Sequence, residues 1–542
     1  MIQRKSYGFW IILLALFFFF PFLGGVHLFD WDEINFAEIA REMIISNNYL
    51  QPSINFEPFW EKPPLFIWMQ ALSFHIFGVN EYAARFPNAV AGLTTLLFLY
   101  YAGQRIQNKE FALWWVLAYL GSILPHLYFK SGIIDPWFNL FTFVGIYYFY
   151  LFHQGEKQFK FSTLSGLFLG LAVLTKGPVA LGLFGIIFLV YYIFNAFRGF
   201  ISPKYLLFWL LTFISVNGLW YGVETWKNGT WFMEQFILYQ IRLFMIPDAG
   251  HGGFFGYHFV VLLLGCFPAS AFAVPALFRK IQTYETDQFK SFIFLQKIIL
   301  WVVLIVFSIV TTKIVHYSSL AYFPISYLAA SELYRIIQHK EKMALFSKIF
   351  LPFNGILFIL ALWAIPILYP FRDQFISLIG DQQAKAALVE TELHFAWWTF
   401  IPGFIMLAVL ILSKIFFKVA PTQSMRYLFI GNAIVINLTL YAFIGKIEAF
   451  SQRPAIDTFT QYAGKPVNVY GYKSYAHLFY GKVSRHMPKA EEGMPGEDMI
   501  VVAKISKREE IENRFPHWVL MHEKAGWLTY LNPASKEKAD LP

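Results

Sequence analysis

The residues FWIILLALFFFFPFLGGVHLF, at positions 9–29, form an apolar run that follows Arg4 and Lys5 directly. A run of this length is sufficient for a helix that crosses the hydrocarbon core of a bilayer. It is longer than a typical signal-peptide core, and no pair of small residues suited to cleavage follows it. We therefore expect an uncleaved first membrane span with its N-terminus in the cytoplasm.

The composition of the whole chain agrees with a membrane protein. Of its 542 residues, 57% are hydrophobic and 14% are charged, which excludes an ordinary soluble globular protein. The net charge of +9 is typical of basic cytoplasmic loops, so we expect no nucleic-acid partner. Because Cys266 is the single cysteine, no disulfide can form within the chain.

Similar apolar runs recur along the first 450 residues. They predict an all-α polytopic membrane protein with about thirteen transmembrane helices, near residues 9–29, 84–103, 111–129, 137–153, 161–174, 178–197, 205–221, 257–278, 292–310, 316–334, 346–369, 396–415 and 425–445. The apolar residues 65–78 are too few for a span and follow Pro63 and Pro64, so they are expected to form a juxtamembrane or re-entrant helix.

Basic residues mark every second loop, which the positive-inside rule places in the cytoplasm. They are Arg4/Lys5, Arg105/Lys109, Lys157/Lys160, Arg198/Lys204, Arg279/Lys280/Lys290, Arg335/Lys340/Lys342 and Lys414/Lys418/Arg426. The opposite, outer face then receives a mixed set of ionisable residues: Asp32, Glu61, Lys62, Asp135, Lys176, Arg242, His251 and Lys313.

Residues 451–542 have the composition of a soluble α/β domain, which the same topology places outside. Strands are expected at 467–471, 499–504 and 517–521. Ser506 and Glu509 have the spacing of a capping box, which predicts a short helix that ends near Arg514.

The first outer loop carries the densest charge, in Asp30-Trp-Asp-Glu-Ile-Asn-Phe-Ala-Glu-Ile-Ala-Arg-Glu-Met43. Asp30 or Asp32 can cap an amphipathic helix that lies flat in the membrane interface. Asp32 can equally be functional, and this stretch alone leaves both interpretations open. Glu61-Lys-Pro-Pro64 is either a solvated turn or a rigid site for a phosphate or a metal–phosphate pair.

Each further candidate also has a simple structural explanation. Asp135 before Pro136 is typical of a turn, and Lys176 can simply mark the end of a helix. Lys313, near Tyr317, can be a long side chain that extends its charge to the membrane interface. The long loop 226–257 carries Arg242 and the glycine-flanked His251. Together, carboxylates and cations on one membrane face suit group transfer from an anionic lipid carrier, which needs a base and a stabilised leaving phosphate.

In their order and spacing these motifs resemble the GT-C glycosyltransferases of the protein O-mannosyltransferase and lipid A aminoarabinose transferase group. The residues that carry the resemblance are the Asp32–Met43 segment, Glu61-Lys-Pro-Pro64, Asp135-Pro136, Thr175-Lys-Gly-Pro178, and Leu262–Pro268 after His251. The resemblance extends to about Tyr317.

The resemblance implies an inner-membrane enzyme that moves a sugar from an undecaprenyl-phosphate type of carrier to a lipid, glycan or protein acceptor on the periplasmic face. It implies Asp32 as the general base and Asp135 as the second catalytic carboxylate. Lys62 and Lys176 would contact the carrier phosphate, and a divalent metal (Zn, Mg or Mn) would lie at Glu61 and His251. Further substrate contacts are expected from Glu33, Arg242, Lys313 and Tyr317.

Two other classes of protein remain open at this stage. A transporter or lipid flippase would need charges inside the spans and paired broken helices. A non-catalytic membrane scaffold would tolerate alanine at Asp32, Lys62 and Asp135. Direct displacement of the carrier phosphate would invert the anomeric carbon of the sugar.

Overall fold

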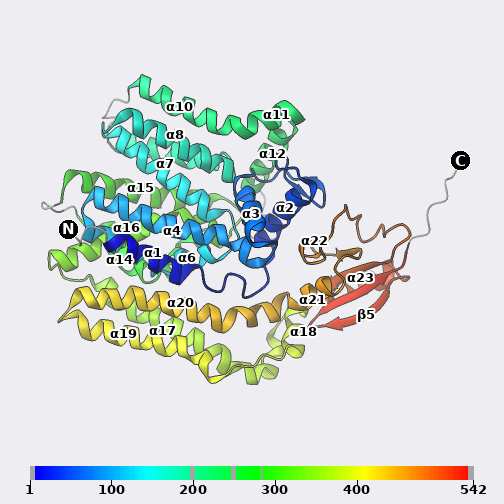
Figure 1. The fold of residues 1–542 in the computed structure, drawn as a ribbon. Helices are drawn as coiled ribbons and strands as arrows, with labels where there is room; N and C mark the ends of the chain where they lie inside the picture. Colours follow the sequence, from blue (N-terminus) through cyan, green and yellow to red (C-terminus); the bar gives the residue numbers. More distant parts are fainter. Residues whose placement is uncertain (1–5, 196–201, 246–251, 281, 283–284, 535–542) are drawn as a thin grey trace.

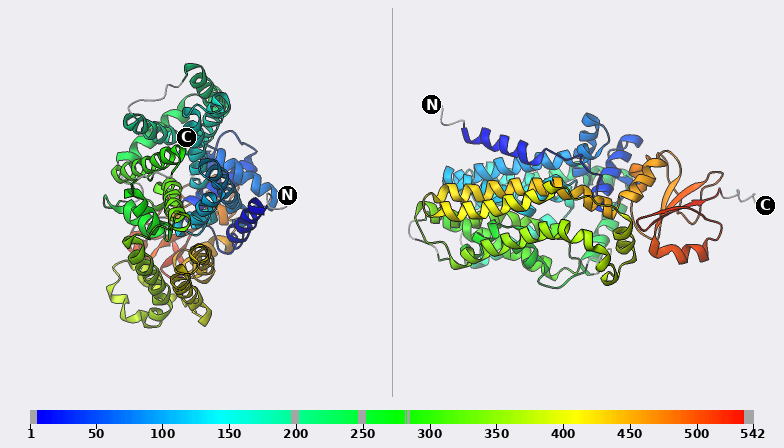
Figure 2. Two further views of the ribbon diagram at one scale, coloured as in Figure 1. Left: turned by 90° about the vertical axis from the view of Figure 1, so that its left-hand side faces the viewer. Right: turned by 90° about the horizontal axis from the view of Figure 1, so that it is seen from below.

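The computed structural model describes residues 6–195, 202–245, 252–280, 282 and 285–534. Long helices lie side by side along one direction, and the C-terminal sheet lies beyond one end of this bundle (Figure 1). The view from below shows the same arrangement, with the start of helix α1 (Ser6–Phe19) at the opposite end (Figure 2). The chain is a mostly helical, multi-pass membrane protein.

Helices lie at all thirteen apolar ranges, although the first, Ser6–Phe19, covers only about half of residues 9–29. They are α1 (Ser6–Phe19), α4 (Glu81–Ile106), α5 (Lys109–Leu120) with α6 (Ile123–Leu127), α7 (Asp135–His153), α8 (Gln158–Lys176), α9 (Val179–Phe194), α10 (Pro203–Asn217), α13 (Tyr257–Gly265) with α14 (Ala269–Phe278), α15 (Asp287–Ile309), α16 (Tyr322–Gln338), α17 (Leu345–Leu368), α19 (Ile401–Phe417) and α20 (Pro421–Ser451).

Within the described residues, six helical segments are long and apolar enough to cross a membrane, and eight if each of two bent helix pairs counts as one span. The bent pairs are α5 with the segment Ile123–Lys130, at 81°, and α13 with α14, at 120°. Pro268 lies at the second bend, where its ring prevents one continuous helix. Helices lie at the thirteen expected positions, but fewer than thirteen of them meet this criterion of length and composition. The expected number of thirteen spans is therefore not confirmed.

The first loop folds into two short helices, α2 (Asp32–Ser46) and α3 (Leu65–Phe77), so residues 65–78 form the short helix that was expected. Residues 33–43 of α2 are all buried inside the protein, while its orientation in the membrane interface stays a prediction. Arg41 forms its hydrogen bonds inside the protein: it donates to both oxygens of Glu38, at 2.7 and 2.6 Å, and to the carbonyl of Val483 at 2.6 Å.

The C-terminal part is an α/β unit with a four-stranded sheet. Its strands are β3 (Val467–Tyr470), β4 (Met499–Lys504), β5 (Val519–Lys524) and β6 (Trp527–Asn532), in the order β3-β4-β6-β5. β3 and β4 are parallel and the other pairs are antiparallel. The predicted capping box is wrong, because α23 (Arg508–Arg514) begins after Lys507 and has no side-chain cap.

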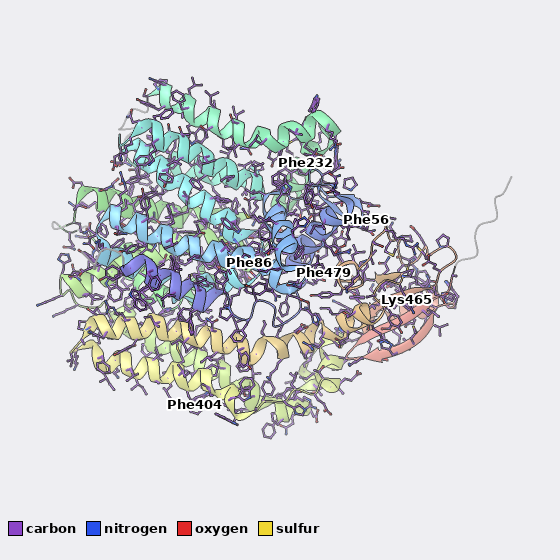
Figure 3. The ribbon with its side chains drawn as sticks, in the orientation of Figure 1. Phe56, Phe86, Phe232, Phe404, Lys465 and Phe479 are labelled. Atoms are coloured by element: carbon purple, nitrogen blue, oxygen red, sulfur yellow. The ribbon has the colours of Figure 1, made fainter. Side chains whose placement is uncertain are left out.

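The C-terminal part shares a hydrophobic core with the first loop. Ile34 of α2 and Phe74 of α3 belong to the same buried cluster as Phe459 of α21 (Arg453–Gln461) and Leu478 of α22 (Ala476–Tyr480). Figure 3 labels Phe479 of α22 at this junction, where its ring centroid lies 6.5 Å from that of Phe74. This shared core fixes the sheet against the end of the bundle where the charged motifs lie.

Candidate active site

A cavity of about 1420 Å³ lies at the end of the bundle next to the C-terminal sheet. Its wall is built from the first loop, the ends of several long helices and the C-terminal part. Five of the eight ionisable residues expected on the outer face line it, namely Asp32, Glu61, Lys62, Asp135 and Lys176, and Glu33 lines it as well. Residues from distant parts of the chain thus meet in one chamber.

Asp32 is the first residue of α2, but it does not cap the helix. Trp31 occupies the N-cap position, and no side chain there accepts a hydrogen bond from the helix. The Asp32 side chain is 33% exposed in the cavity, and its Oδ2 lies 3.4 Å from Nε2 of His316. The predicted capping role of Asp32 is therefore wrong, and its carboxylate is available to a substrate.

The electrostatics of the cavity favour an ionised Asp32. Burial by itself would raise the pKa of this carboxyl group, but the hydrogen bond from His316 and the charges of Lys62 and Lys176 outweigh it. The resulting pKa is lower than the ordinary aspartate value. Asp32 is thus a carboxylate at neutral pH, which is the form that accepts a proton.

Asp135 and Lys176 form an ion pair where two helices end. Asp135 is the first residue of α7 and its side chain is 3% exposed, while Lys176 is the last residue of α8. Lys176 Nζ lies 2.6 Å from Asp135 Oδ1 and 5.0 Å from the ring centroid of Tyr317. Gly177 has a φ of +92°, and a Cβ there would lie 2.2 Å from Phe236, so only glycine allows the chain to turn here.

Lys62 approaches the cavity from the rigid segment before α3. Its Nζ lies 5.0 Å from the ring centroid of Tyr239, and Arg242 lies 5.5 Å from the same ring on its own helix, α12 (Trp231–Met245). Burial lowers the pKa of Lys62, although neighbouring Glu61 and Asp32 act in the opposite direction. A partly desolvated ammonium of this kind gains more from an anionic ligand than one in bulk water does.

Two of the residues expected to contact substrate have structural partners instead. Glu33 lines the cavity, but both its oxygens accept from Arg85, at 2.9 and 2.8 Å, and from the backbone N–H groups of Gly132 and Phe29. Lys313 donates to three backbone carbonyls at the end of α15, those of Phe307, Ser308 and Val310. Its ammonium group therefore pairs with carbonyl groups at the C-terminal end of α15.

The expected metal site is incomplete in the described part of the chain. Glu61 lines the cavity, whereas His251 lies outside the described residues. Among the residues that the structure describes, no three His, Cys, Asp or Glu side chains gather closely enough to hold a metal ion.

Comparison with known proteins shows what the chain is similar to in sequence and in fold. The family model described as dolichyl-phosphate-mannose-protein mannosyltransferase matches residues 61–220. The structure superposes on the crystal structure of ArnT from Cupriavidus metallidurans bound to undecaprenyl phosphate, with a TM-score of 0.78, 16% identity, and coverage of 98% of this chain and 99% of that chain. These findings confirm the resemblance to the GT-C glycosyltransferases.

The chain is also similar in sequence to two proteins named undecaprenyl phosphate-alpha-4-amino-4-deoxy-L-arabinose arabinosyl transferase. The one from Shewanella sediminis (strain HAW-EB3) is 27% identical over 340 residues, 61% of this chain and 61% of its own length. The one from Aeromonas salmonicida (strain A449) is 27% identical over 407 residues, 73% of this chain and 71% of its own length.

Several residues of the cavity were not predicted from the sequence, among them His316, Lys473 and Lys504. His316 lies on the 3-10 helix η4 (Val315–Ala321), and its Nε2 is 3.4 Å from Asp32 Oδ2 and 3.7 Å from Asp135 Oδ2. Its neighbours in sequence, Lys313 and Tyr317, were selected as candidates by their charge and spacing. A histidine that immediately precedes Tyr317, after a long apolar helix, was the available signal.

Proposed function

We propose that this GT-C glycosyltransferase moves a sugar from a polyprenyl-phosphate carrier of the undecaprenyl type to an acceptor on the outer face of the inner membrane. One observation carries the proposal: the ionised Asp32 opens into the same cavity as Lys62 and Lys176. A proton acceptor and two ammonium groups are what displacement of a carrier phosphate requires. The names of the two relatives include undecaprenyl phosphate, which supports a carrier of this class.

The reaction is a single displacement at the anomeric carbon. The acceptor hydroxyl gives its proton to Asp32, and its oxygen forms a bond to C1 of the sugar. The bond between C1 and the carrier phosphate oxygen breaks, and its electron pair leaves with the phosphate. Lys62 and Lys176 stabilise the developing negative charge, so no acid is needed on the leaving group, and the anomeric centre inverts.

The remaining site residues support this step from outside the reacting atoms. Asp135 holds Lys176 through the 2.6 Å ion pair, and Tyr317 covers the same ammonium group. Arg242 extends the positive side of the cavity beyond Tyr239. We assign Glu33 to support of the first loop, since its oxygens are already bonded.

The membrane arrangement is part of the proposal. Thirteen helices cross the bilayer in residues 1–450, with the N-terminus in the cytoplasm. Residues 451–542 form a periplasmic domain, so the cavity opens toward the periplasm. The acceptor is then a lipid, glycan or protein of that compartment that offers a hydroxyl or a phosphate oxygen.

The test is transfer by the purified full-length protein in lipid nanodiscs supplied with undecaprenyl-phosphate sugars and envelope lipids. Mass spectrometry would follow the glycosylated product and the released undecaprenyl phosphate together. Asp32→Asn should reduce kcat by about 10²–10⁴-fold, because the base is lost while the shape of the side chain is kept.

Asp287→Asn is the matched control, because Asp287 is fully exposed at the start of α15 and is remote from the cavity. Full activity of Asp32→Asn would remove Asp32 as the base. Movement of the labelled lipid across the membrane without any covalent product would favour a flippase.

A further inference from the structure

We infer that His316 is a positioning residue of the transferase: its imidazole bridges the two carboxylates of the cavity and fixes the one that takes the acceptor proton. The inference rests on the proposed function for its catalytic meaning, and on the geometry alone for the bridge. His316 itself contacts neither sugar nor phosphate in this scheme. It acts through Asp32.

The bridge follows from three distances. Nε2 of His316 lies 3.4 Å from Asp32 and 3.7 Å from Asp135, and Lys176 contacts the other oxygen of Asp135 at 2.6 Å. The side chains thus alternate in the order carboxylate, imidazole, carboxylate, ammonium. Two carboxylates this close to one another repel, and a donor between them relieves the repulsion.

The backbone of η4 is tied to the helix that carries Asp135. Ser319 donates its hydroxyl to the carbonyl of His316, and Asn139 Nδ2 donates to Ser319 Oγ at 2.7 Å. Asn139 lies one turn after Asp135 on α7. The imidazole also packs edge-on against Tyr317, with ring centroids 5.6 Å apart, so both its backbone and its ring are held in place.

The bridge has a consequence for Asp32. Burial raises the pKa of this group, and the hydrogen bond from His316 is the largest influence that lowers it. The other charged groups that face Asp32 are Lys62 and Lys176, with Asp30 beside it on the same loop. Without the imidazole, only the charges of Lys62 and Lys176 oppose the effect of burial, so the pKa of Asp32 should rise.

A merely structural histidine would leave the titration of Asp32 unchanged. The experiment therefore measures the pH dependence of carbodiimide labelling at Asp32, which detects the protonated carboxyl group by mass spectrometry of the full-length protein in nanodiscs. In His316→Ala the labelling midpoint should move to higher pH. In His316→Gln, which keeps a neutral N–H donor of similar reach, it should move less.

Transfer activity gives the second readout. In His316→Ala the acid limb of kcat should move to higher pH in parallel with labelling, while binding of undecaprenyl phosphate stays as in the wild type. His394→Ala, at an exposed histidine, is the control. An unchanged labelling midpoint in His316→Ala overturns the inference. If the wild type forms no product, but the labelling midpoint of Asp32 is still higher in His316→Ala than in the wild type, the proposed function fails and the bridge stands.

Discussion

Lys176 connects the two halves of the proposed reaction, since its ammonium group touches the Asp135 carboxylate and also faces the cavity. Lys176→Met keeps the length of the stem but removes the charge. We expect kcat to fall by about 10²–10³-fold, because a preorganised donor to the leaving phosphate is lost. Binding of undecaprenyl phosphate, measured by titration of the purified protein, should weaken as well. Lys160→Met, at an exposed site in the first turns of the same helix, should change neither quantity.

Helix α2 is held by buried charge, and this makes its stability sensitive to pH. Arg85 donates two hydrogen bonds to Glu33, and the side chains of Arg85 and Glu33 are 4% and 7% exposed, respectively. Burial opposes ionisation of Glu33, but Arg85 and two backbone N–H groups outweigh it and hold its pKa below the ordinary value. The stabilisation is thus complete above the pKa of an unfolded glutamate, about 4.3, and is lost as pH falls through the lower folded value.

Glu33→Gln should destabilise the first loop by about 3–5 kcal/mol, since it leaves Arg85 buried without a counter-charge. Thermal unfolding in detergent would show a lower midpoint at pH 7 and a weaker loss of stability toward acid pH than in the wild type. Glu110→Gln, at an exposed position in the first turn of α5, should unfold like the wild type. An unchanged midpoint for Glu33→Gln would show that the pair contributes no net stability.

The same element shows what the sequence can and cannot predict. The apolar runs predicted the positions of the long helices. In lipid, the backbone N–H and C=O groups of such a run must hydrogen-bond to one another, and a helix achieves this. They could not predict that α2 is buried, since its cover, α22, lies more than 400 residues away in the chain. Strand β6 was missed because its hairpin turns at Ala525 and Gly526, where an alanine takes a φ of 50° and gives no turn signal. The motifs indicated several charged residues of the cavity, including Asp32, Lys62 and Lys176, but His316 lies there only because α2, α7 and η4 meet.

At the scale of the whole molecule, the C-terminal part does more than cover the bundle, because it supplies part of the cavity wall. Lys473 and Lys504 both line the cavity. The ammonium of Lys473 lies 4.4 Å from the ring centroid of Trp31, directly before Asp32, and that of Lys504 lies 5.6 Å from the ring of Tyr472. These two cations come from the C-terminal part of the chain, which lies beyond one end of the helical bundle.

The double variant Lys473→Gln, Lys504→Gln tests this contribution. With an acceptor that carries a phosphate, we expect KM for the acceptor to rise by about tenfold or more, since a hydrogen bond to a charged group contributes about 1.5–3 kcal/mol. With the same acceptor after removal of its phosphate, KM should not change, and binding of undecaprenyl phosphate should stay constant in both cases. Lys465→Gln, at the exposed lysine labelled in Figure 3, is the control within the same part of the chain. Equal KM values for the double variant and the wild type would restrict the C-terminal wall to a packing role, because the two positive charges would then not reach the acceptor.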